Sequence, residues 1–266
     1  MNKKWIFAIA IIIIGALLAN SAAGGIFGND EDDGIYQVSL LQSFMHGEYE
    51  GFVTVGDLKS HGDTGLGTFD GANGEMIFLD GVVYQADSKG NINIMEDSET
   101  VPFATVTNFD CDSKMSNISA KDFDNLTNQL TKEIEKSGVN QIYVMKIDAE
   151  CENITVRSVV KQEKPYDEFT EVAARDQKVF NHGKLNGTIV AVYFPEYMDK
   201  LNMHGWHLHF LSDDKTIGGH VLNASIKHAD AEIDEISEFD MVVPDRDSFN
   251  NKDLNENMTK KINSVE

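Results

Sequence analysis

Residues 203–220 read MHGWHLHFLSDDKTIGGH and contain four of the chain's eight histidines. A strand directs alternate side chains to the same face, so His207 and His209 would leave one face about 6–7 Å apart. Leu208 and Phe210 would then leave the opposite face, where they can pack into a core. The alternation therefore predicts a strand with one face for ligands and one face for the core.

The residues after this strand predict a hairpin that adds a third imidazole. If Asp214 and Lys215 are the central residues of the turn, antiparallel pairing sets His209 opposite His220. The rings of all three histidines then converge on one face. His204 would leave the strand on the other face, so we do not include it in the set.

Three neutral imidazoles with an open fourth position are typical of a catalytic zinc site. Because no softer ligand accompanies them, Zn²⁺ is favoured over copper, while Mn²⁺, Fe²⁺ and Ni²⁺ stay open as alternatives. We expect structural or surface roles for the histidines that stand alone in the sequence, which are His46, His61, His182 and His228.

A second group of unusual residues lies in residues 65–80, GLGTFDGANGEMIFLD. The glycines do not form the pattern of a nucleotide-binding turn. Glu75 begins an apolar strand, where a lone carboxylate usually has a partner, a metal or a proton. Arg157, in TVRSV, is likewise a single cation within a strand pattern. For both residues, a surface charge on a strand is the alternative.

The N-terminus has the pattern of an export signal. Two lysines precede the apolar run Trp5–Ala19, and small residues follow. This predicts a signal peptide over residues 1–23, with an uncleaved membrane anchor as the alternative. Residues 24–34 read as an acidic linker. The net charge of −22, without a basic cluster, argues against a nucleic-acid partner.

The rest of the chain predicts a strand-rich α+β fold with two domains. We expect an N-terminal α/β domain over residues 35–165 and a C-terminal β-rich, metal-binding domain over residues 166–266. Apolar spacing predicts a helix over residues 36–45. We also expect a longer helix over residues 120–136 and a polar terminal helix over residues 248–263. An exported protein can form a disulfide between Cys111 and Cys151, and two free thiols are the alternative.

Several motifs together resemble the α-acetolactate decarboxylase family. They are IYQVSLLQSFMHGEYEG from residue 35, the segment GLGTFDGANGEMIFLDG, TVRSV, FPEYM, and HLHFLSDDKTIGGHVL. They cover residues 35 to about 225 in the order of the family. The combination of GEMIFLDG with the spaced histidine motif is highly specific.

The resemblance implies a homodimeric zinc enzyme of two α/β domains that converts 2-acetolactate to (R)-acetoin and CO₂. It implies the ligands His207, His209 and His220. It also implies Glu75 and Arg157 as catalytic residues, with Thr68 binding substrate. A glutamate near the C-terminus completes the family's site, and spacing favours Glu266, with Glu256 as the alternative.

This chemistry suits the groups that the sequence offers. Loss of CO₂ from a β-keto acid leaves an enediolate, which a divalent cation stabilises as a Lewis acid. Arg157 can hold the departing carboxylate. Glu75 or Glu266 can deliver the proton that determines the configuration of the product. Two alternatives remain: an exported metal- or ligand-binding protein without turnover, and another metal-dependent lyase or hydrolase acting on a related hydroxy-keto acid.

Overall fold

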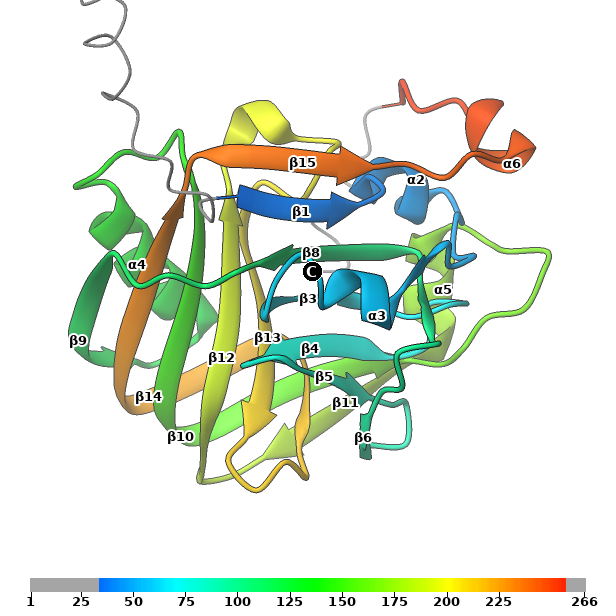
Figure 1. The fold of residues 1–266 in the computed structure, drawn as a ribbon. Helices are drawn as coiled ribbons and strands as arrows, with labels where there is room; N and C mark the ends of the chain where they lie inside the picture. Colours follow the sequence, from blue (N-terminus) through cyan, green and yellow to red (C-terminus); the bar gives the residue numbers. More distant parts are fainter. Residues whose placement is uncertain (1–33, 257–266) are drawn as a thin grey trace, which may run out of the picture. The chain divides into compact units, whose positions relative to one another are not determined.

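The computed structural model describes residues 34–256, which belong to one compact unit (Figure 1). The expected signal peptide or anchor, nearly all of the expected linker, and Glu266 lie outside the described residues. Within the described range, no helix has both the length and the apolar character needed to cross a membrane.

The first sheet joins the two ends of the described chain. In spatial order its seven strands are β15 (Glu238–Val242), β1 (Gly34–Val38), β8 (Phe103–Thr107), β3 (Thr64–Thr68), β4 (Glu75–Leu79), β5 (Val82–Ala86) and β6 (Ile92–Ile94). The pairing of β1 with β15 is parallel, and the others are antiparallel. Asp80 and Gly81 connect β4 to β5 with positive φ at both positions, as the Asp-Gly pair predicts.

The second sheet curls until four of its strands form a closed ring. Its strands are β11 (Gln177–His182), β10 (Ile142–Val159), β12 (Leu185–Phe194), β13 (Gly205–Ser212), β14 (Gly218–Ile236) and β9 (Ser113–Ala120). The ring closes because the long strand β14 pairs with β13 near the turn and with β10 along most of its length. The two sheets have crossing strand directions (Figure 1).

Each sheet has an apolar face that excludes water. Leu208 and Phe210 are buried in the core of the ring, as their alternation with the histidines predicts, and helix α4 (Phe123–Ile134) packs Leu126 into the same core. A second apolar cluster joins the sheets, where Ile77 of β4 packs with Leu211 of β13. The face that carries His207 and His209 therefore lies next to the first sheet.

Short elements complete the chain around this framework. They are α2 (Leu41–Met45), the pair β2 (Val53–Thr54) and β7 (Thr100–Val101), α3 (Val55–Leu58), α5 (Phe169–Asp176), the 3₁₀ turn η1 (Glu196–Met198) and α6 (Asp247–Asn250). Thr54 and Asp57 form a capping box at α3. α2 and α5 pack beside each other, and both contribute to the functional site.

Two helix predictions were wrong in extent. The segment expected as a helix over residues 36–45 is strand β1 up to Val38, and only α2 is helical. Pairing of β1 with both β8 and β15 overrides the helical spacing of its apolar residues. The terminal helix expected from residue 248 is limited to α6, which ends at Asn250, and residues 257–266 lie outside the described range.

The disulfide that the sequence left open is absent, because both cysteines are free thiols. The Cys111 thiol donates a hydrogen bond to the Ser113 carbonyl at 3.3 Å. Cys151 lies on β10, where burial raises the pKa of its thiol to about 11. The alternative that the sequence left open, two free thiols, is the one observed.

The two-domain description is not confirmed by this topology. β10 belongs to the half expected as the N-terminal domain, but it pairs with β11, β12 and β14 of the other half. β1 similarly pairs with β15. A boundary near residues 165–166 stays a prediction.

Candidate active site and metal centre

The hairpin of β13 and β14 has the register predicted from the sequence. His209 pairs with His220, Phe210 with Gly219, and Leu211 with Gly218. Lys215 has a positive φ of 57° in the turn between the strands. The hairpin thus sets His209 and His220 opposite each other, and His207 leaves the same face two positions earlier on β13.

The three imidazoles converge on a single point. Nε2 of His207 lies 3.1 Å from Nε2 of His209 and 3.0 Å from Nδ1 of His220. The ring centroids are 4.9 to 5.4 Å apart, and each pair of rings is steeply inclined. Their burial is almost complete, since the exposed fractions are 9% for His207, 1% for His209 and 2% for His220.

Burial keeps these rings neutral. It lowers the pKa of His207 to about 3, with a further contribution from the positive charge of Arg157. Burial also lowers the pKa of His209 and His220 well below the ordinary value. A neutral imidazole keeps a lone pair on one of its two ring nitrogens, so each ring of the triad offers a metal-binding atom at ordinary pH.

A backbone carbonyl of the first sheet orients one of the rings. Nδ1 of His209 donates a hydrogen bond of 2.6 Å to the carbonyl oxygen of Met76, on β4. This fixes the tautomer, because the proton on Nδ1 leaves the lone pair on Nε2, which faces the other two rings. A hydrogen bond of this kind to the outer nitrogen is usual for histidines that bind metals.

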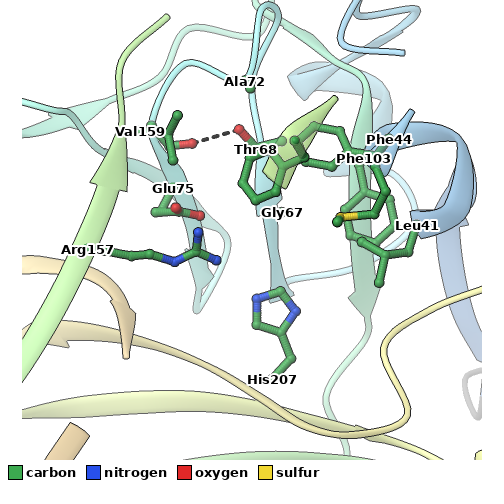
Figure 2. A pocket seen from close by; sticks show the side chains of 13 residues that line it. Leu41, Phe44, Gly67, Thr68, Ala72, Glu75, Phe103, Arg157, Val159 and His207 are labelled. Carbon is green, nitrogen blue, oxygen red and sulfur yellow. Dashed lines mark hydrogen bonds between the residues drawn. The ribbon is translucent and has the colours of Figure 1, made fainter. Parts of the chain in front are cut away.

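Glu75 and Thr68 come from neighbouring strands of the first sheet. They are paired in the register of β3 and β4, and both are buried. Oε2 of Glu75 lies 3.6 Å from Nε2 of His209. The Thr68 hydroxyl donates a 2.7 Å hydrogen bond to the Gly74 carbonyl, just before Glu75 (Figure 2). The surface-charge alternative for Glu75 therefore does not hold.

Arg157 comes from the second sheet and is also buried, with 2% of its surface exposed. It lies opposite His220 in the register of β10 and β14, and its side chain points toward Glu75 (Figure 2). The close approach of these strands depends on Gly219, because a Cβ there would lie 2.5 Å from the Arg157 carbonyl oxygen. The surface-charge alternative for Arg157 is also wrong.

These polar groups open into a pocket whose other wall is apolar (Figure 2). Its polar side includes His207, Glu75, Arg157 and Thr68. The apolar side contains residues of α2, β8, β10 and α5, namely Leu41, Phe44, Met45, Phe103, Val159 and Phe169. We did not identify these apolar residues from the sequence, where they have no local pattern that separates them from core residues.

The remaining predicted residues lie elsewhere or outside the described range. Glu266 is outside it. Glu256 does not line the pocket, and its side chain lies near His46. His61 stacks on Tyr36 at the surface, with ring centroids 3.9 Å apart.

Comparisons with known proteins identify the family of this chain. A family model described as alpha-acetolactate decarboxylase matches residues 35–256. Proteins of that name are 37% identical over 232 residues in Brevibacillus brevis and 37% identical over 261 residues in Methylococcus capsulatus. The first match covers 87% of this chain and 80% of the relative, and the second covers 97% and 99%.

Solved structures give the same result. The alpha-acetolactate decarboxylase of Bacillus subtilis strain 168 superposes with a TM-score of 0.83 at 28% sequence identity, covering 88% of this chain and 99% of that one. A Staphylococcus aureus protein described as similar to alpha-acetolactate decarboxylase superposes with a TM-score of 0.82 at 28% identity, covering 88% and 100%. The chain therefore belongs to the α-acetolactate decarboxylase family.

Proposed function

We propose that this protein is an acetolactate decarboxylase that converts 2-acetolactate to (R)-acetoin and CO₂ with one Zn²⁺ per chain. The observation that carries the proposal is the convergence of three neutral histidines, one of which lines a pocket together with a buried carboxylate and a buried guanidinium. Membership of the family supports the same reaction.

The histidine triad fits a divalent cation. Two nitrogen ligands of one tetrahedral zinc are about 3.3 Å apart, which is close to the 3.0 and 3.1 Å between the triad nitrogens. His207, His209 and His220 would hold the ion. When bound, the ion would supply Lewis-acid stabilisation of the negative charge that develops as CO₂ leaves.

Arg157 is proposed to hold the substrate carboxylate. A buried guanidinium makes strong, charge-assisted hydrogen bonds to a carboxylate, and its planar shape fixes the orientation of the group. The apolar wall of the pocket faces these polar groups and excludes water from them. The departing carboxylate would therefore be held in place until it loses its charge.

Glu75 is proposed to deliver the proton to the reacting carbon. Its Oε2 lies 3.6 Å from Nε2 of His209, so the carboxylate is next to the triad. Because the pocket has one polar side, a proton from this side reaches only one face of the planar intermediate. The reaction would therefore form a single enantiomer of acetoin. Thr68 is proposed to contact the substrate, and Glu266 to act as a second acid from the C-terminus.

The test is acetoin formation by zinc-loaded protein with racemic acetolactate. We expect rapid formation that a chelator abolishes and that the His207→Ala/His209→Ala variant lacks. A rate no higher than spontaneous decay, in protein that binds zinc at one per chain, would contradict the decarboxylase proposal. A binding protein on the same scaffold, or another metal-dependent lyase or hydrolase, would then be the better description.

Export, assembly and domain division are further proposals. The N-terminal apolar run supports export, with cleavage after residue 23 or retention as an anchor. The mass of the protein isolated from its host would distinguish these two outcomes. The family resemblance supports a homodimer, which the mass in solution would test. Limited proteolysis near residues 165–166 would test the expected domain boundary.

A further inference from the structure

One aromatic ring of the pocket wall lies against the buried guanidinium. Cζ of Arg157 lies over the ring of Phe169, 5.6 Å from its centroid. Both residues line the pocket, and both are buried, with exposed fractions of 2% and 5%. The face of an aromatic ring carries partial negative charge and attracts a cation within about 6 Å. We propose that Phe169 is a positioning residue, which holds the Arg157 guanidinium where it binds the substrate carboxylate.

The fold explains why this ring reaches the guanidinium. Arg157 and Val159 are two positions apart on β10, so their side chains leave the same face of the strand. Helix α5 packs on β10, and its first residue, Phe169, belongs to the same apolar cluster as Val159. The start of α5 is therefore placed over the part of β10 that carries Arg157.

Neighbouring rings fix the orientation of Phe169. Its ring centroid lies 5.0 Å from that of Phe44, at an interplanar angle of 49°, and 6.4 Å from that of Tyr49, at 75°. These are favourable distances for tilted and edge contacts between aromatic rings. Tyr49 is fully buried, and its hydroxyl donates a 2.9 Å hydrogen bond to the carbonyl of Asp167, two residues before Phe169. The ring therefore cannot turn its face away from Arg157 without disturbing these contacts.

An aromatic ring suits this position because it attracts the cation without neutralising it. A carboxylate in the same place would pair with the N–H groups of the guanidinium. Phe169 has no oxygen or nitrogen acceptor, so it does not compete with a carboxylate for those groups. The attraction is strongest where water is excluded, as it is in this pocket. The alternative is that Phe169 only fills space, in which case the charge distribution of its ring would not matter.

Binding of two small ligands to the zinc-loaded protein tests the proposal, which rests on the carboxylate-binding role proposed for Arg157. The probe 2-hydroxyisobutyrate has a carboxylate, whereas acetoin has none. A ring-fluorinated phenylalanine at residue 169 keeps the shape of the ring and weakens its negative face. In an NMR titration, it should raise the Kd of 2-hydroxyisobutyrate and leave that of acetoin unchanged. Phe169→Leu should raise the Kd of 2-hydroxyisobutyrate about tenfold, because the guanidinium is then in place in fewer molecules.

Two further variants serve as controls. In Phe52→Leu a matched contact is lost, because Cζ of Arg246 lies over the Phe52 ring at the same distance of 5.6 Å, and neither residue lines the pocket. This variant should leave both Kd values unchanged. Arg157→Met should weaken binding of 2-hydroxyisobutyrate at least as much as Phe169→Leu does. Adding Phe169→Leu to Arg157→Met should have no further effect, because the ring acts through the guanidinium.

Two results would overturn the role of Phe169. One is an unchanged Kd of 2-hydroxyisobutyrate in the fluorinated protein, although Arg157→Met weakens binding. The other is equal weakening of both ligands, which would indicate a general change in pocket shape. If Phe169→Leu does not fold, the fluorinated protein decides, because its ring keeps the shape of phenylalanine. An unchanged Kd in Arg157→Met would contradict the carboxylate-binding role of Arg157, and the role of Phe169 with it.

Discussion

The buried histidine triad should make the metal-free protein lose stability as the pH falls below about 6.5. Each histidine takes up a proton near pH 6.5 in the unfolded chain, but burial lowers the pKa of His207 to about 3 in the folded protein. Between these values the unfolded state binds more protons, so the free energy of unfolding decreases as the pH decreases. Burial lowers the pKa of His209 and His220 in the same direction.

The effect is large enough to measure. One histidine contributes about 1.4 kcal/mol per pH unit in this window, so a fall from pH 6.5 to pH 5 costs about 2 kcal/mol for His207. Burial of His209 and His220 adds to this loss in the same direction. Because the total stability of many domains is about 5–15 kcal/mol, the metal-free protein should be clearly less stable in mild acid.

Urea unfolding at pH 7 and pH 5, in the presence of a chelator, measures this loss. The His207→Gln variant should lose about 2 kcal/mol less than the wild type between the two pH values. His228→Gln is the control, because His228 is exposed on β14, and it should lose as much as the wild type. Equal losses in the wild type and His207→Gln would refute the claim that His207 is buried and neutral.

Three further changes test the site. Glu75→Gln should lower kcat by about 10²–10⁴-fold with zinc content unchanged, if Glu75 transfers the proton; a kcat within tenfold of wild type would contradict this. Arg157→Lys should lower kcat/KM about 100-fold, because an ammonium cannot make the paired contact of a guanidinium; equal kinetics would exclude carboxylate binding there. Gly219→Ala should reduce the free energy of unfolding, measured in urea, by about 1–3 kcal/mol. The new Cβ would lie 2.5 Å from the Arg157 carbonyl oxygen, and residue 219 has a φ of +144°. An unchanged unfolding midpoint would refute the close approach of the two strands.

The histidine triad could be predicted from the sequence because its members lie within one hairpin. Strand alternation and a short turn determine the positions of His207, His209 and His220 without reference to the rest of the fold. Glu75 and Arg157 were recognisable as single charges in apolar strands. Strand geometry and the cost of burying charge marked these two residues as unusual but left a surface charge as the alternative, and the family resemblance indicated their catalytic roles.

The apolar half of the pocket could not be predicted in this way. Phe44, Phe103 and Phe169 are brought together by α2, β8 and α5, which are far apart in the sequence. In the sequence, each resembles an ordinary core residue. The wrong helix over residues 36–45 has a related cause, because the pairing of β1 with two neighbours outweighs a local preference.

The position of the site between the two sheets explains how distant segments act on one centre. β4 supplies two consecutive groups to it: the Glu75 carboxylate lies near His209, and the Met76 carbonyl accepts a hydrogen bond from Nδ1 of His209. Adjacent residues on a strand direct their side chains to opposite faces, so only a backbone group of Met76 can share this side with Glu75. The carboxylate and the imidazole are therefore held in register by the same strand. Any change that shifts β4 relative to β13 must alter ring orientation and carboxylate position together, and we infer that the tight apolar packing between these strands preserves both.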